Sequence, residues 1–115
     1  MLETSVTDGG FNATISLNSH HIVYAGHFPG HPVTPGVIQM QIVHELLEDH
    51  LCGNVKLMEM SKCKFQKILN PDETSKLNVH IEIRRLDELL AINAWGEYEK
   101  DIFFKLNAVY LPINK

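Results

Sequence analysis

The sequence predicts an α+β fold in which one central helix lies across a curved antiparallel sheet. A single helical pattern occupies residues 37–51, and alternating strand patterns precede and follow it. The later strand patterns are separated by short turns, which implies antiparallel pairing. The 115 residues, 44% hydrophobic and 21% charged, fit one domain over residues 1–115.

The first expected strand covers residues 11–17, where apolar and polar residues alternate, with Gly9-Gly10 as a turn or lead-in. A stiff loop is expected over residues 18–34. Thr34 is a suitable N-cap, and Pro35 suits the first helical position. The apolar residues of the helix form more than one stripe, which predicts cover on most sides. Gly53 is expected to end the helix.

Four strands are expected after the helix. The short segments between these strands contain residue types that favour turns. The last strand is apolar on both faces in part, which predicts a central place or a subunit contact. The expected strands cover residues 55–65, 77–83, 89–98 and 102–111, with turns at 70–72, 87–88 and 99–101.

Bulk properties exclude several function classes. The net charge is −4, and no lysine- or arginine-rich run suggests nucleic-acid binding. The sequence shows neither a signal peptide nor an apolar run that would span a membrane, so we expect a cytoplasmic protein. Cys52 and Cys63 are expected to be reduced thiols, and their spacing suggests no zinc site. Nor do the clustered histidines suggest a metal site.

The most informative stretch runs from His27 to Val37, with the sequence HFPGHPVTPGV. Its three prolines and two glycines predict a rigid, irregular loop that leads directly into the helix. An imidazole held by such a loop is a candidate catalytic base. His31 is expected to be a solvated loop residue.

This stretch resembles the signature of the FabZ/FabA-type 3-hydroxyacyl-acyl-carrier-protein dehydratases, whose fold is called the hotdog. Residues 64–72 are similar to the strand and turn that follow the helix in that family. The resemblance implies a homodimer with an acyl tunnel at the interface, while a heterodimer or a higher hotdog assembly stays open. It implies a thioester substrate on an acyl carrier protein, with no metal and no bound cofactor. The short N-terminal region resembles smaller dehydratases of secondary lipid pathways, such as those of aryl polyenes.

The resemblance places His27 at the catalytic histidine and Gly36 at the glycine whose amide polarises the thioester carbonyl. Phe28 and Val37 are the further substrate-binding positions. These roles fit the chemistry, because dehydration needs a base for the proton next to the carbonyl and a donor for the charge that develops on oxygen.

The family has an acid fourteen residues after the histidine, where this chain has Gln41. Glutamine forms hydrogen bonds but cannot protonate the leaving hydroxyl. Gln41 can position the hydroxyl while His27 returns the proton, or Glu45 one helical turn further on can act as the substitute acid. The third interpretation is a site that binds without turnover.

Two other functions stay open. A hotdog acyl thioesterase is one, and a non-catalytic acyl-thioester-binding subunit that pairs with an acid-bearing hotdog partner is the other. Lys62, Lys64 and Lys67 are candidates for contact with an acidic carrier protein, or else a solvated strand face. Trp95 is expected to belong to the core, with Tyr98, Phe103 and Phe104.

Overall fold

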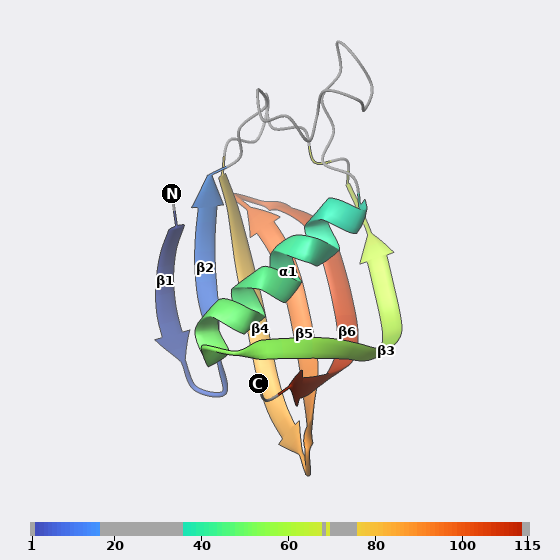
Figure 1. Ribbon diagram of the computed structural model, residues 1–115. Coiled ribbons are helices and arrows are strands. Elements are labelled where there is room, and N and C mark those ends of the chain that lie inside the picture. The colour runs from blue at the N-terminus through green and yellow to red at the C-terminus, as the bar shows by residue number, and fades with distance from the viewer. Residues whose placement is uncertain (1, 17–35, 68, 70–75, 114–115) are drawn as a thin grey trace.

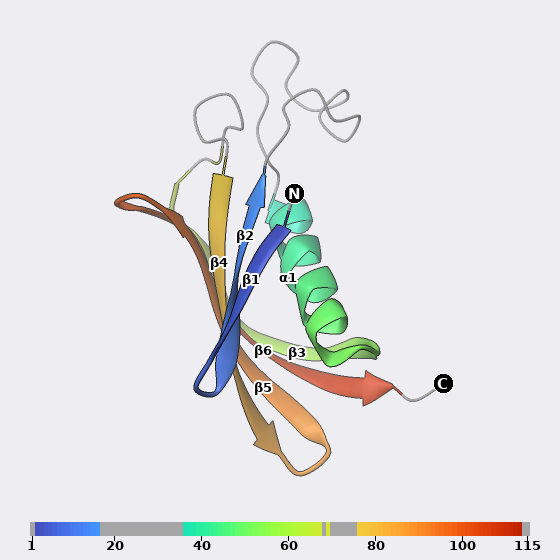
Figure 2. The same ribbon diagram turned by 90° about the vertical axis from the view of Figure 1, so that its left-hand side faces the viewer.

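The computed structural model describes residues 2–16, 36–67, 69 and 76–113. In these residues one helix packs on one face of a six-stranded antiparallel sheet, with strand order β1-β2-β4-β5-β6-β3 (Figures 1 and 2). The predicted architecture is therefore confirmed. The elements are β1 (Leu2–Thr7), β2 (Gly10–Ser16), α1 (Gly36–Leu51), β3 (Asn54–Phe65), β4 (Lys76–Leu86), β5 (Leu89–Tyr98) and β6 (Asp101–Ile113).

Strand β1 was not predicted. It pairs with β2 through a tight turn in which Gly9 has a φ of 81°, a conformation that favours glycine. Gly10 is not part of a lead-in, because it is the first residue of β2 and lies opposite Glu82. The pattern of β1 is weak because it is an edge strand: Val6 shares the register of buried Phe11, yet it is 78% exposed.

The strands of the middle of the sheet agree with the predicted alternation. In β2, β4 and β5, alternate residues face α1 and are buried, while the residues between them face outward. Strand β6 lies between β5 and β3, so its two-sided apolar pattern is explained by an interior position. The largest fully buried side chains are Phe103, Phe104, Leu47, Leu69, Leu77, Ile81, Leu90, Leu106, Val43 and Val79.

Helix α1 starts at Gly36 and ends with a Schellman motif. The Gly53 N–H donates to the Glu48 carbonyl over 3.2 Å, and the Cys52 N–H donates to the Asp49 carbonyl over 3.3 Å. Cys52, with a φ of 55°, takes the left-handed position that we predicted for Gly53. The expected cap Thr34, the loop over 18–34 and the turn at 70–72 lie outside the described residues.

Strand β3 bends strongly and brings the far end of the strand toward the start of α1 (Figure 1). Its pairing with β6 shifts register between Leu57 and Glu59 and again between Met60 and Lys62. Such bulges increase the local bend and twist of a strand. In the described part of the chain, no helix is long and apolar enough to cross a membrane.

Candidate functional site

The start of α1 is the first part of the candidate site. Gly36 is the first helical residue, and the first amides of a helix have no partner within the helix. The ring of Phe65, from the end of β3, lies directly against Gly36, because an added Cβ would come within 2.7 Å of two ring carbons. A side chain at position 36 would therefore push this ring away. Phe65 is 45% exposed, so an aromatic surface stays accessible beside the helix N-terminus.

The second part is the outward face of α1. Gln41 and Glu45 are both exposed and are four residues apart, so they share one face of the helix, as predicted. The opposite face carries buried Val43 and Leu47. In the single chain, Gln41 and Glu45 are exposed while most of the described side chains of the helix are buried or half-buried, which agrees with the predicted cover on most sides.

A polar cluster fixes the C-terminal half of α1 to β3. Glu48 Oε2 accepts a hydrogen bond from the Val55 N–H over 2.9 Å and lies 3.4 Å from His44 Nε2. The His44 ring meets the edge of Tyr110 at a centroid distance of 5.7 Å. Burial raises the pKa of the Tyr110 phenol above its usual 10.0, and Cys63 raises it further. The phenol therefore stays protonated at neutral pH.

Three predicted site residues receive no test of their roles. His27 and Phe28 lie outside the described residues, and of Val37 only the helical backbone is described. Their roles stay predictions. The structure does bring together Gly36, Gln41 and Glu45 on one helix, with Phe65 beside its start. Phe65 is adjacent to Lys64 in the sequence, but the sequence alone did not indicate that the bend of β3 brings its ring against Gly36.

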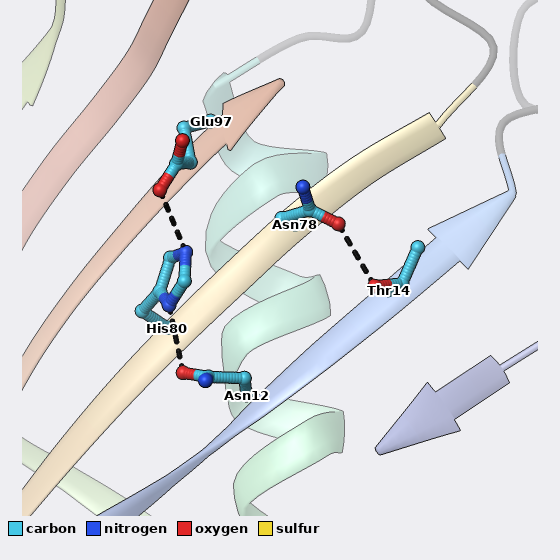
Figure 3. Close-up of polar contacts among 5 residues, drawn as sticks. All are labelled: Asn12, Thr14, Asn78, His80 and Glu97. Atoms are coloured by element: carbon cyan, nitrogen blue, oxygen red, sulfur yellow. Dashed lines mark hydrogen bonds and ion pairs between the residues drawn. The ribbon is translucent and has the colours of Figure 1, made fainter. Parts of the chain in front are cut away.

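A network on the outer face of the sheet was also missed (Figure 3). His80 Nδ1 lies at a hydrogen-bond distance of 2.7 Å from Asn12 Oδ1. His80 Nε2 lies 2.8 Å from Glu97 Oε2, but this contact does not have the geometry of a hydrogen bond. The His80 ring stacks on Trp95 at a centroid distance of 5.0 Å. Trp95 is therefore an outer-face residue, contrary to the prediction of a core position. Trp95 lies between buried Ala94 and Gly96 in β5, and this alternation indicates that its side chain points to the outer face.

The lysines of the β3 end differ from one another. Lys62, Lys64 and Lys67 are all exposed, but Lys67 forms an ion pair with Asp101 over 2.9 Å. A hollow of about 470 Å³ also lies on the outer face, and of the described site residues neither Gly36 nor Gln41 nor Glu45 lines it. It is bordered by Ser61, Arg84, Ala91, Asn93, Asn107 and Val109, among others.

One helix across a strongly curved antiparallel sheet defines a hotdog domain. Among protein families, the ApeI-like model, described as ApeI dehydratase, matches residues 3–93. The chain belongs to the ApeI-like dehydratase family. This assignment agrees with the resemblance to FabZ/FabA-type dehydratases that the sequence motif indicated.

Individual relatives agree with this assignment. The chain is 33% identical over 70 residues to 3-hydroxyacyl-[acyl-carrier-protein] dehydratase FabZ of Rickettsia massiliae, which covers 54% of this chain and 48% of that protein. The chain thus spans about half the length of the curated relatives it matches.

Two solved structures share the fold. A chain of the dehydratase heterocomplex ApeI:P from Xenorhabdus doucetiae superposes with a TM-score of 0.77 at 18% identity, over 96% of both chains. An uncharacterized protein from Erwinia carotovora subsp. atroseptica superposes with a TM-score of 0.71 at 18% identity, over 96% of this chain and 91% of the other.

Proposed function

We propose that this chain dehydrates 3-hydroxyacyl thioesters delivered by an acyl carrier protein, in fatty-acid or related acyl or polyene biosynthesis. The observation that carries the proposal is the start of α1 at Gly36, at the end of the dehydratase-like sequence motif that contains His27. Membership of a dehydratase family supports the same reaction class.

In the proposed mechanism, the His27 imidazole removes the proton from the carbon next to the thioester carbonyl. Negative charge then develops on the carbonyl oxygen. The Gly36 N–H, at the positive end of the helix dipole, donates a hydrogen bond to that oxygen. Because glycine has no side chain, the Phe65 ring packs directly against the Gly36 backbone and is positioned beside this amide.

The leaving hydroxyl must receive a proton. Gln41 is exposed and can hold the hydroxyl by hydrogen bonds while protonated His27 returns its proton. Glu45 is the nearest exposed carboxyl on the same helical face and is the alternative donor. The usual contribution of such a general acid is about 10²–10⁴ in rate, so we expect slow turnover if Gln41 acts alone.

The test is hydration of crotonyl and longer enoyl thioesters, the reverse reaction, by wild type and by His27→Ala, Gln41→Glu and Glu45→Gln. We expect measurable hydration by wild type and a loss of about 10²-fold or more for His27→Ala. Gln41→Glu should raise the rate by about tenfold or more if an acid is limiting. A loss in Glu45→Gln would assign the donor to Glu45. Binding without hydration by wild type and Gln41→Glu would refute the proposed reaction.

We also propose that a second hotdog chain covers β3. This 12-residue strand is at the sheet edge and leaves apolar Leu57, Met58 and Phe65 between 39% and 50% exposed. An edge strand of this length with apolar side chains favours association with another chain. A homodimer would place two copies of the face that carries Gln41 near one interface.

A non-catalytic role in a heterocomplex is the second candidate. It is favoured by Gln41 in place of the acid and by the resemblance to a chain of the ApeI:P heterocomplex. In this case an acid-bearing hotdog partner would supply the missing proton donor. Hydration only after addition of such a partner would favour it, whereas an active homodimer would exclude it.

A further inference from the structure

We propose that the outer face of the sheet, where β3 and β6 meet at the end nearest the start of α1, docks an acidic protein surface. The docking surface consists of Lys62, Lys64, Lys105 and Trp95. The inference rests on the proposed function in one respect: the acidic partner is taken to be the carrier protein that delivers the acyl thioester.

The cations of this surface are adjacent. Lys64 lies directly opposite Lys105 in the β3–β6 pairing, and Lys62 lies opposite Asn107 one outward position further along β3. Like charges directly opposite one another destabilise a sheet. Among the described residues, these three lysines form no ion pair, whereas nearby Lys67 is paired with Asp101. An anionic partner would relieve this repulsion.

Trp95 gives the surface a rigid aromatic anchor. It lies opposite Lys105 in the β5–β6 pairing and opposite His80 in the β4–β5 pairing. The two rings are stacked with an angle of 16° between their planes, and His80 is itself held at Asn12 and Glu97 (Figure 3). Tryptophan is among the residues that contribute most of the binding energy at protein interfaces.

The described carboxylates of the same face form no ion pair with these lysines, and two of them contact other groups. Glu97 is engaged with His80, and Glu82 accepts a hydrogen bond from the Asn93 side chain over 2.8 Å. Glu59 lies between the two register shifts of β3, and the second of them separates it from Lys62. In a chain of net charge −4, these lysines form a local positive cluster, and its complement is an acidic surface.

The docking surface lies close enough to the candidate site for a bound carrier protein to deliver its acyl thioester there. Lys64 faces outward, while the next residue, Phe65, faces the helix side and contacts Gly36. A partner on the lysines would thus lie across the end of β3 from the helix N-terminus. The hollow bordered by Ser61 and Asn107 adjoins Lys62 and provides room for partner side chains.

The experiment compares two charge-reversal pairs with the same change in net charge. Lys64→Glu/Lys105→Glu alters the docking surface. The matched control, Lys76→Glu/Arg85→Glu, changes two exposed residues near the two ends of β4, away from β3. Binding to fluorescently labelled holo acyl carrier protein is measured by anisotropy at low and high salt, and thermal unfolding verifies the fold of each variant.

We expect the docking pair to weaken carrier binding by about tenfold or more at low salt, and the control pair to change it by less than about twofold. Hydration of crotonyl N-acetylcysteamine, which has no carrier, should be equal in both pairs. Equal weakening by the two pairs would overturn the proposal, as would no carrier binding by wild type. Binding to vesicles of phosphatidylglycerol in place of the carrier would also overturn it. Selective weakening without any hydration would refute the proposed reaction and leave the docking surface standing.

Discussion

Gly36 meets two demands at one backbone position. It begins α1, where its amide has no partner within the helix, and it accepts the Phe65 ring against its Cα. Gln41 and Glu45 follow on the outward face, so the groups proposed to act on the carbonyl oxygen and on the leaving hydroxyl belong to one helix, while the proposed base His27 precedes that helix in the chain. At the residue scale, the described part of the candidate site therefore consists of the first three turns of α1 together with one aromatic ring.

The contact between Gly36 and Phe65 can be measured as a coupling. Gly36→Ala should destabilise the protein by about 1 kcal/mol, because the ring must shift to admit the methyl group. In a Phe65→Ala background, the same change should be neutral or stabilising, since alanine favours a helix more than glycine. Urea unfolding of the four proteins gives the coupling energy. Identical effects of Gly36→Ala in both backgrounds would contradict the contact.

Helix α1 and strand β3 are fixed to one another at both ends of the helix. Phe65 meets the start of α1, and Glu48 near its end accepts the Val55 N–H at the start of β3. Two bulges bend β3 between these points, so the strand curves around the helix (Figure 1). At the element scale, the curvature of β3 therefore determines how this strand contacts both ends of the helix.

The Glu48 anchor gives a prediction at this scale. Glu48→Ala should lower the free energy of unfolding by about 1–2 kcal/mol, because the Val55 N–H loses a charged acceptor. Glu48→Gln retains an acceptor oxygen and should cost less. Asp49→Ala removes the same charge from an exposed neighbour and serves as the control. If Asp49→Ala and Glu48→Ala have equal effects on chemical denaturation, the hydrogen bond does not anchor the helix.

The whole molecule has two unlike sheet edges and two unlike faces. Edge strand β1 is short, while edge strand β3 is long, bent and apolar in part. The helix covers one face, and the other carries the His80 network and the lysines (Figure 2). Association with a second hotdog chain at β3 and with an acidic partner on the outer face would use different parts of the molecule.

Assembly through β3 can be tested with one charge. Met58→Glu places a carboxylate in the proposed interface and should shift the protein to the mass of a single chain in light scattering after size-exclusion chromatography. Val6→Glu changes an even more exposed residue on the other edge, 78% against 50% exposed, and should leave the assembly intact. Dissociation by Val6→Glu but not by Met58→Glu would move the interface to β1.

The sequence by itself determined the helix and the strands from β2 onward, and the family resemblance placed Gly36 at the N-terminus of the helix. Alternation reports burial, so residues such as Val79 and Ile81 could be assigned to the core face without knowing their neighbours. Glycine and proline marked the turns, although Cys52 and not Gly53 took the left-handed position at the end of the helix.

Only the tertiary structure decided which residues meet across the chain. Phe65 contacts Gly36, Lys64 lies opposite Lys105, and His80 is held between Asn12 and Glu97, all of them far apart in the sequence. Strand β1 could also be assigned only from the tertiary structure. Its exposed side chains show no strand pattern, and its pairing with β2 defines it as a strand. Periodicity records which face of an element is buried, whereas register and the bulges that shift it depend on pairing with another strand.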